Sequence, residues 1–234
     1  YMSFKDIFNI DAEVKESAHA RVNLIGEHTD YTGGYVMPTL LSFKNIIEIS
    51  QNNSNEFTVY SQHFKEKKTF NDFKKSSNNE WVDYIKGCLY IFFDEHKISS
   101  TYLNIYISSD IPLERGISSS SALCVATLKA LNTFFETKIK DPEIAKLAKK
   151  VEFNYIGVSG GIMDQMVSSI GIHGKAFFMN CKNLEYELIN FPENWKFCLI
   201  DSEVQRNLRD SSYNERFAEL QEAEKKLGVE YLGE

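Results

Sequence analysis

Long apolar runs are missing from this sequence. No stretch reaches 18 consecutive apolar residues, so the chain offers no candidate for a membrane-spanning helix. The first residues also lack the apolar core of a secretory signal peptide. These two absences predict a cytoplasmic protein without a membrane partner.

Cysteine is scarce and widely spaced. The four cysteines are Cys88, Cys124, Cys181 and Cys198, and none forms a Cys-x-x-Cys pair. This spacing argues against a zinc site. Cys88 and Cys124 fall in apolar patterns with helical spacing, so we expect both to be small buried side chains. This cysteine usage fits a reducing compartment.

Long blocks of positive charge are absent too. The net charge is −7, and the basic residues cluster only in the short patch 65–68. Nucleic acid is therefore not expected as the main partner. An acidic protein still binds ATP, because the phosphates interact with a local loop and a metal ion rather than with the net charge. A chain of 234 residues suffices for one large domain or two small ones.

The chain begins with mainly strand-like patterns and continues with mainly helical ones. Alternating apolar residues between turn signals predict strands at 17–25, 35–37, 43–49, 57–60, 102–107, 176–179 and 197–200. Apolar residues spaced three and four apart predict helices at 81–93, 118–135, 141–155 and 211–227, with a short one after Gly160-Gly161. The pair Asp141-Pro142 suits the N-cap and first position of its helix.

The stretch Ala20–Tyr31 is the most informative part of the sequence. An apolar run ends in Glu27-His28-Thr29-Asp30-Tyr31, and Gly33-Gly34 follows closely. Carboxylates and an imidazole at the end of a strand are good partners for sugar hydroxyls, which both donate and accept hydrogen bonds. A strand that ends in a polar turn would account for the glycines but not for this particular combination of polar residues.

A second motif, Ile111–Ala122, combines Gly116 with four consecutive serines where a helix is expected to begin. A helix N-terminus exposes unpaired N–H groups and a partial positive charge, which suits phosphate. The serine hydroxyls add donors and one potential magnesium ligand. The alternative is a serine-rich helix cap, although four serines exceed what one cap requires.

A third constellation consists of Glu152, Gly160-Gly161 and Asp164-Gln165. Phosphoryl transfer to a hydroxyl needs a carboxylate near the attacking oxygen, a metal ion and a cation for the developing charge. From the sequence alone, Glu152 is expected on a solvent-exposed helix face. For Asp164, the alternative interpretation is that its side chain only caps the N-terminus of a helix that follows the glycine pair.

Together these motifs resemble those of the galactokinases within the GHMP small-molecule kinases. Ala20–Tyr31 closely resembles the galactokinase signature, Ile111–Ala122 resembles the phosphate loop, and Gly161–Gln165 resembles the family's Gly-Ile-Met-Asp-Gln run. Trp81–Gly87 is similar to a family helix whose Trp lies near the adenine. Ser211–Asn214 is similar to the segment whose Tyr contacts galactose.

Two positions depart from the family pattern. Glu114 stands where the family usually has glycine, which lets the backbone approach phosphate closely. An inward carboxylate would repel phosphate, unless Arg115 compensates for it or Glu114 faces solvent. His19-Ala20 replaces the usual Pro-Gly, which affects the entry of the strand more than the chemistry.

The resemblance implies an α+β fold: a GHMP kinase N-terminal domain (ribosomal protein S5 domain 2-like) with a mixed β-sheet, a helical layer and the start of a second domain. The expected division is 1–200 for the first domain and 201–234 for the beginning of the second. The family's third, glycine-rich motif is missing, so we expect the chain to correspond to the N-terminal portion of a galactokinase.

The implied activity is ATP-dependent phosphorylation of the anomeric C1 hydroxyl of α-D-galactose, with Mg²⁺ as metal ion and galactose and ATP as substrates of a monomer. The implied roles are catalysis for Asp164 and Arg21, sugar binding for five residues, nucleotide binding for five, and metal binding for two. The sugar-binding residues are Glu27, His28, Asp30, Gly161 and Tyr213. The nucleotide-binding residues are Gly116, Ser118, Ser119, Ser120 and Trp81, and the metal ligands are Ser120 and Glu152.

Two alternatives stay open from the sequence. One is a kinase for N-acetylgalactosamine or another galacto-sugar, which competition between the two sugars would distinguish. The other is a galactose-sensing regulatory protein of the same fold with weak activity, which Glu114 and the missing third motif favour. The presence of both Arg21 and Asp164 favours the enzyme, because a pure sensor needs neither.

Overall fold

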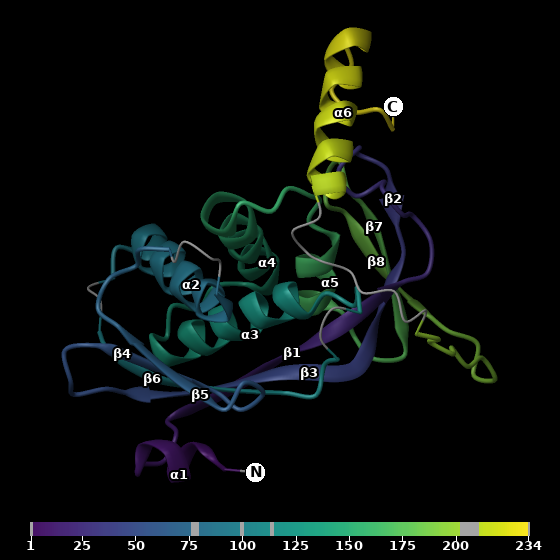
Figure 1. Ribbon diagram of the computed structural model, residues 1–234. Helices are drawn as coiled ribbons and strands as arrows, with labels where there is room; N and C mark the ends of the chain where they lie inside the picture. The colour runs from purple at the N-terminus through teal and green to yellow at the C-terminus, as the bar shows by residue number, and fades with distance from the viewer. Residues whose placement is uncertain (1, 76–79, 99–100, 113–114, 202–210, 234) are drawn as a thin grey trace.

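The computed structural model describes residues 2–75, 80–98, 101–112, 115–201 and 211–233, and for 211–213 it describes the backbone only. The sheet carries helices α2, α3, α4 and α5 on one face and the short helix α1 on the other, while α6 projects from the end near β2 (Figure 1). The mixed sheet and helical layer expected from the sequence are confirmed.

The sheet has eight strands in the order β2-β7-β3-β6-β4-β5, with β1 paired to β3 and β8 paired to β7. Strands β4 and β6 are parallel, and the other pairs are antiparallel. The strands are β1 (Val14–Asn23), β2 (Tyr35–Val36), β3 (Pro38–Gln51), β4 (Phe57–Ser61), β5 (Glu66–Phe70), β6 (Leu103–Ser109), β7 (Lys175–Asn180) and β8 (Tyr186–Asn190).

The helices are α1 (Phe4–Phe8), α2 (Trp81–His96), α3 (Ser119–Phe134), α4 (Asp141–Lys150), α5 (Met163–Ile170) and α6 (Ser211–Leu227). The single helix expected over 141–155 is in fact α4 followed directly by a π-helix, Val151–Ile156. The expected cap is one residue off, because Lys140 is the N-cap and Asp141 is already helical. π-Helical turns occur frequently at functional sites.

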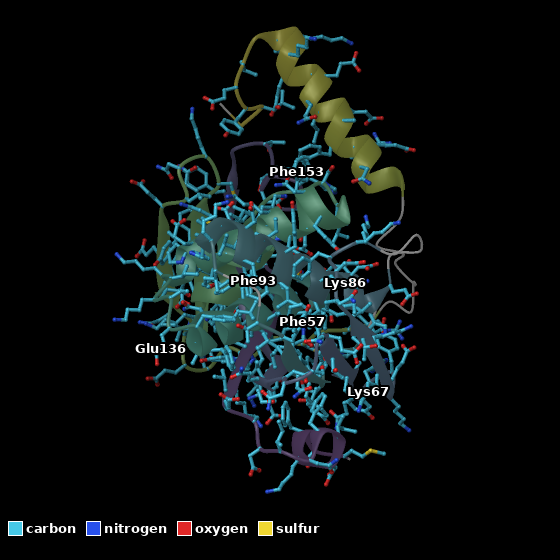
Figure 2. All side chains as sticks on the ribbon, turned by 90° about the vertical axis from the view of Figure 1, so that its left-hand side faces the viewer. Phe57, Lys67, Lys86, Phe93, Glu136 and Phe153 are labelled. Atoms are coloured by element: carbon cyan, nitrogen blue, oxygen red, sulfur yellow. The ribbon has the colours of Figure 1, made fainter. Side chains whose placement is uncertain are left out.

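The main core lies between the sheet and the helical layer. Phe57 on β4 and Phe93 on α2 sit in the middle of the molecule, whereas Lys67 and Glu136 lie at its periphery (Figure 2). The Phe57 ring lies 5.1 to 6.3 Å from four other aromatic rings, those of Phe70, Phe73, Phe93 and Tyr102. Cys88 and Cys124 are fully buried in this core, as expected. The close packing of these rings holds the sheet and α2 together.

One expected strand is wrong and three elements were not expected. Residues 197–200 form no strand, and the side chains of Phe197, Leu199 and Ile200 are exposed. Strands β5 and β8 and helix α1 carry no clear apolar pattern of their own. Both strands lie at the ends of the sheet, where half of the side chains face solvent and charged residues are common. In the part of the chain that the structure describes, no helix is both long enough and apolar enough to cross a membrane.

Candidate active site

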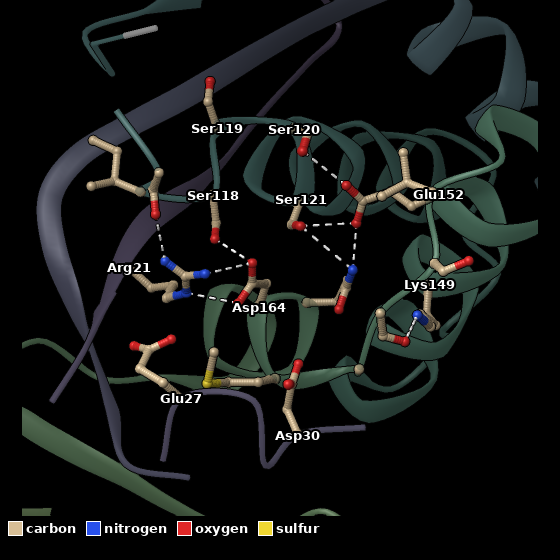
Figure 3. Close-up of a pocket in the computed structure, with 18 of the residues that line it drawn as sticks. Arg21, Glu27, Asp30, Ser118, Ser119, Ser120, Ser121, Lys149, Glu152 and Asp164 are labelled. Carbon is tan, nitrogen blue, oxygen red and sulfur yellow. Dashed lines mark hydrogen bonds and ion pairs between the residues drawn. The ribbon is translucent and has the colours of Figure 1, made fainter. Parts of the chain in front are cut away.

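A cavity of about 440 Å³ opens where β1, α5 and the N-terminus of α3 meet (Figure 3). Its volume lies in the range of small-molecule sites. Charged side chains of both signs line it: Arg21, Glu27, Asp30, Arg115, Lys149, Glu152, Asp164 and Arg216. These residues come from segments far apart in the sequence, so only the fold brings them together.

Arg21 and Asp164 form a two-pronged ion pair at the centre of the cavity. The Nε and Nη2 atoms of Arg21 each donate a hydrogen bond to one carboxylate oxygen of Asp164, and both donor–acceptor distances are 2.7 Å. Nη1 of Arg21 donates a hydrogen bond of 2.9 Å to the carbonyl oxygen of Gly116, so the serine loop contacts the same ion pair. The register of β1 against β3 shifts between His19 and Arg21, as in a β-bulge. Bulges redirect side chains and are common beside active sites.

Asp164 is not a helix cap. It lies in the first turn of α5, whose N-cap is Ile162 without a side-chain cap bond. Besides Arg21, it accepts a hydrogen bond from the hydroxyl of Ser118. Bidentate charge-assisted bonds hold a carboxylate in one orientation, so Asp164 is fixed toward the cavity rather than toward its own helix.

Ser118 occupies the N-cap position of α3 with a φ of 63°, a left-handed conformation. Its hydroxyl makes no cap bond with the helix and donates to Asp164 instead. The serine-cap interpretation is therefore wrong for Ser118. Such a conformation costs free energy in a non-glycine residue.

The first turn of α3 faces the cavity. Four consecutive serines line the cavity there: Ser118, Ser119, Ser120 and Ser121. A sixteen-residue helix presents unpaired N–H groups and a partial positive charge there. The carbonyl of Ser119 accepts a hydrogen bond of 3.0 Å from Asn45 on β3, which anchors this turn to the sheet. The predicted phosphate-binding residues are thus assembled at one anion-suited surface.

Glu152 is buried, with 6% of its surface exposed, so the expectation of a solvated helix face is wrong. Its carboxylate accepts hydrogen bonds from the hydroxyls of Ser120 and Ser121, both 2.8 Å, and from the amide of Gln165. Burial raises the pKa of Glu152, and the three hydrogen bonds act in the opposite direction. Glu152 continues the buried face of α4, four positions after Ala148 and seven after Ala145, which is ordinary α-helical spacing.

A buried carboxylate whose hydrogen-bond donors are all neutral is a suitable ligand for a cation. Together with the hydroxyl of Ser120, Glu152 offers the oxygen donors that Mg²⁺ prefers, and phosphate oxygens and water would complete the shell. The residues present therefore fit a magnesium ion. Among the described residues, no cluster of three or more His, Cys, Asp or Glu side chains forms a metal site within the protein alone.

The polar loop after β1 forms the opposite wall of the cavity. Glu27 and His28 are exposed, and Asp30 is partly buried. The side-chain amide of Asn23 donates a hydrogen bond of 3.0 Å to the carboxylate of Glu27, and His28 is hydrogen-bonded to Tyr31. Burial, with a smaller contribution from the negative charge of Asp164, raises the pKa of Asp30 to about 6, although the positive charges of Lys149 and Arg21 oppose this shift.

Gly161 lies against Asp30. A Cβ atom at Gly161 would stand 2.2 Å from Oδ2 of Asp30, closer than atoms can approach. Only glycine fits here without moving the carboxylate. The predicted sugar-binding residues Glu27, His28, Asp30 and Gly161 therefore share one wall of the cavity.

Three predicted residues are placed differently or lie outside the described part. Trp81 does not line the cavity; its ring stacks on Phe64 with 5.8 Å between the ring centroids, and its indole N–H donates to Glu66. Helix α2 contributes Tyr84 instead. The side chain of Tyr213 and all of Glu114 lie outside the described residues. Arg115 forms an ion pair of 3.1 Å with Asp201.

Several lining residues had no role assigned from the sequence: Ser121, Lys149, Gln165, Asn214 and Arg216. Ser121 stood within the serine run but had no assigned role. Lys149 follows the buried Ala145 by four positions, so a lysine on an apolar helix face was the available signal. Asn214 approaches through the tertiary fold, where its side-chain oxygen accepts a 3.3 Å hydrogen bond from the amide of Ser159.

Two separate segments match family models. Residues 2–51 match the galactokinase galactose-binding signature, and residues 83–171 match the N-terminal domain of the GHMP kinases. The chain belongs to the GHMP kinase family. The first matched segment contains the polar loop after β1, and the second contains the serine loop together with Glu152 and Asp164.

Curated relatives of this chain include galactokinases. The sequence is 37% identical to Pyrococcus furiosus galactokinase over 220 residues, covering 94% of this chain and 61% of that protein. It is also 37% identical to Thermococcus kodakarensis galactokinase, covering 89% of this chain and 59% of the relative. The chain thus spans about three fifths of the length of these relatives.

Solved structures agree with this placement. The crystal structure of Lactococcus lactis galactokinase complexed with galactose superimposes with a TM-score of 0.87 at 30% identity, covering 98% of this chain and 62% of that one. Methanococcus jannaschii mevalonate kinase superimposes with a TM-score of 0.65 at 23% identity, over 76% of this chain and 56% of that one. The second likeness shows a shared fold alone.

Proposed function

We propose that this chain carries the substrate-binding and catalytic part of a galactokinase, which transfers the γ-phosphoryl group of ATP to the C1 hydroxyl of α-D-galactose. The observation that carries the proposal is the Arg21–Asp164 pair, which lies between a carboxylate-lined wall and the serine-rich N-terminus of α3. The names of the relatives and the galactose-binding signature support galactose as the sugar.

The wall formed by Glu27, His28, Asp30 and Gly161 is the proposed sugar side. Ionised carboxylates accept hydrogen bonds from sugar hydroxyls, and an imidazole accepts or donates according to its tautomer. A site that pairs each hydroxyl rejects sugars that lack one, because its own polar groups then stay unpaired. We also propose a sugar contact for Tyr213, at the start of α6, because a phenolic hydroxyl both donates and accepts hydrogen bonds.

The N-terminus of α3 is the proposed phosphate side, with Gly116, Ser118, Ser119 and Ser120 as the phosphate-binding residues. Trp81 keeps a proposed role near the adenine. Ser120 and Glu152 would hold Mg²⁺. A bound magnesium ion would neutralise phosphate charge and orient the triphosphate.

In the proposed reaction, the C1 oxygen of galactose forms a bond to the γ-phosphorus while the bond to the bridging β–γ oxygen breaks. The proton of the C1 hydroxyl passes to the carboxylate of Asp164. The guanidinium of Arg21 holds this carboxylate in place and offsets negative charge that develops in the transition state. The products are galactose 1-phosphate and ADP.

A direct assay tests the proposal. The 234-residue chain is incubated with Mg²⁺, ATP and galactose, galactose 1-phosphate is detected by mass spectrometry, and P. furiosus galactokinase serves as positive control. We expect galactose 1-phosphate from the chain and at least about 100-fold less from its Asp164→Asn variant. Galactose binding without any product would instead favour a sugar sensor. A preference for N-acetylgalactosamine in competition would shift the sugar assignment. The monomeric state and the cytoplasmic location stay predictions.

A further inference from the structure

Lys149 is the one lysine of α4 whose side chain enters the cavity among the described residues. It lies in the last turn of the helix, four positions after Ala145 and one after Ala148, both fully buried. The side chain of its neighbour Lys150 lies outside the cavity and forms an ion pair of 2.6 Å with Glu95 on α2. Two adjacent lysines therefore occupy opposite environments, one in the cavity and one at the surface.

The ammonium group of Lys149 has defined contacts. It donates a hydrogen bond to the carbonyl of Gly160 and lies 5.6 Å from the centre of the Phe153 ring. Figure 3 shows the Lys149 side chain directed toward the segment that leads to α5, with the bond to Gly160 drawn as a dashed line. An ammonium group is costly to bury unless it is hydrogen-bonded and compensated by charge. Burial lowers the pKa of Lys149, and the carboxylates of Glu152, Asp30 and Asp164 oppose this shift.

The bonded carbonyl belongs to the segment that shapes the sugar side. Gly160 directly precedes Gly161, whose backbone lies against the carboxylate of Asp30 with no room for a side chain. One residue earlier, the amide of Ser159 donates to Asn214. A small displacement of Gly160 would therefore change the distance between Gly161 and Asp30.

We propose that Lys149 is a positioning residue for sugar recognition, which holds the Gly160 carbonyl and thereby keeps the Gly161 backbone against Asp30. The hydrogen bond to Gly160 is the operative contact, and the positive charge moderates the repulsion among the surrounding carboxylates. This inference rests on the proposed function, because it takes galactose as the ligand of this wall.

The test compares Lys149→Met with Lys149→Gln. The two new side chains are similar in length and volume, but only glutamine keeps an N–H donor for the Gly160 carbonyl. Lys150→Met is the matched control, because it removes a neighbouring charge and a surface ion pair outside the cavity. Galactose affinity is measured by calorimetry on the 234-residue chain, together with Mg²⁺–ADP affinity and the melting temperature.

We expect Lys149→Met to weaken galactose binding by about tenfold, the effect of losing a charge-assisted hydrogen bond. Lys149→Gln should stay within about threefold of the unmodified chain, and Lys150→Met should not change galactose affinity. The Mg²⁺–ADP affinity should change by less than about threefold in all three variants. This selective loss, with rescue by the remaining donor, is not expected of a residue that only stabilises the fold.

The inference is overturned if Lys149→Met binds galactose normally, if Met and Gln weaken it equally, or if both ligands are weakened to the same degree. Should Lys149→Met fail to fold, Lys149→Asn replaces it, because asparagine is too short to reach Gly160. Equal galactose affinities of the Asn and Gln variants would then also refute the inference. If the unmodified chain does not bind galactose, the proposed function itself fails, and the inference fails with it.

Discussion

The Arg21–Asp164 pair makes Asp164→Asn the most informative single substitution. The change keeps the shape of the side chain but removes its charge. One of the two 2.7 Å bonds from Arg21 is lost, because an NH₂ group cannot accept it, and the other is left with a neutral acceptor. Both side chains are largely buried, with 13% and 26% of their surface exposed, so solvent does not replace the lost interaction fully. Hydrogen bonds to charged groups contribute about 1.5–3 kcal/mol each.

We therefore expect Asp164→Asn to lower the free energy of unfolding by about 2 kcal/mol. For a chain of this size, that loss corresponds to a decrease of roughly 4–8 °C in melting temperature. Turnover should fall by about 10²–10⁴-fold, the usual contribution of a positioned proton acceptor. Galactose affinity should change by less than about threefold, because the sugar contacts proposed on the opposite wall are unaltered.

The assay combines steady-state kinetics with galactose calorimetry and thermal unfolding. Glu95→Gln is the matched control, because it also removes the charge from one partner of an ion pair, the exposed pair with Lys150. Such surface pairs contribute about 0–1 kcal/mol, so this control should leave all three measurements nearly unchanged. Normal turnover of Asp164→Asn, or a large loss of galactose affinity with normal turnover, would refute the role given to Asp164.

Three further changes test other parts of the site and the core. Asp30→Asn should weaken galactose binding and remove its pH dependence; in the unmodified chain affinity should rise as the pH increases through about 6, where Asp30 ionises. Because the folded pKa of Asp30 is raised, its contribution to stability is present below about pH 4 and is lost as the pH rises through about 6. The same variant should therefore unfold at a higher temperature than the unmodified chain at pH 7 but not at pH 4, and equal melting curves at pH 7 would contradict this. Gly161→Ala should abolish galactose binding while Mg²⁺–ADP binding persists, because the Cβ atom of the alanine would collide with the carboxylate of Asp30. Unchanged galactose titrations by calorimetry would show that residue 161 is not packed closely against Asp30. Phe57→Ala should destabilise the chain by about 3–5 kcal/mol in urea unfolding, and a loss below about 1 kcal/mol would mean that the aromatic cluster relaxes into the space.

The sequence predicted the elements that have their own apolar pattern. The helix at 211–227 matches α6, and the helix at 118–135 matches α3 within a residue at each end. Strands β5 and β8 were missed, because such strands depend on pairing with β4 and β7 more than on their own composition. The opposite error occurred at 197–200, where an apolar run without a pairing partner forms no strand among the described residues.

The candidate site was predicted where residue types alone carry the chemistry. Arg21, Asp30, Ser120 and Asp164 were identified from their motifs, and all line the cavity. Lys149 was not identified, because a lysine near the end of a helix is usually solvated and interacts with the helix dipole. Glu152 was expected to be exposed because charged side chains are mostly solvated. The fold buries it because it continues the buried face of Ala145 and Ala148 and because Ser120, Ser121 and Gln165 donate hydrogen bonds to its carboxylate.

The sequence by itself indicated the family through the resemblance of its motifs, and with the family the mixed α+β architecture and the groups available for chemistry. Local apolar periodicity located most of the helices and strands. The tertiary structure decided which of these groups meet. It joined Arg21 to Asp164 across 143 positions of the chain, buried Glu152 beneath two serines, and directed Lys149 rather than Lys150 into the cavity. Contacts of this kind depend on the packing of α3, α4 and α5 on the sheet, which local patterns do not encode.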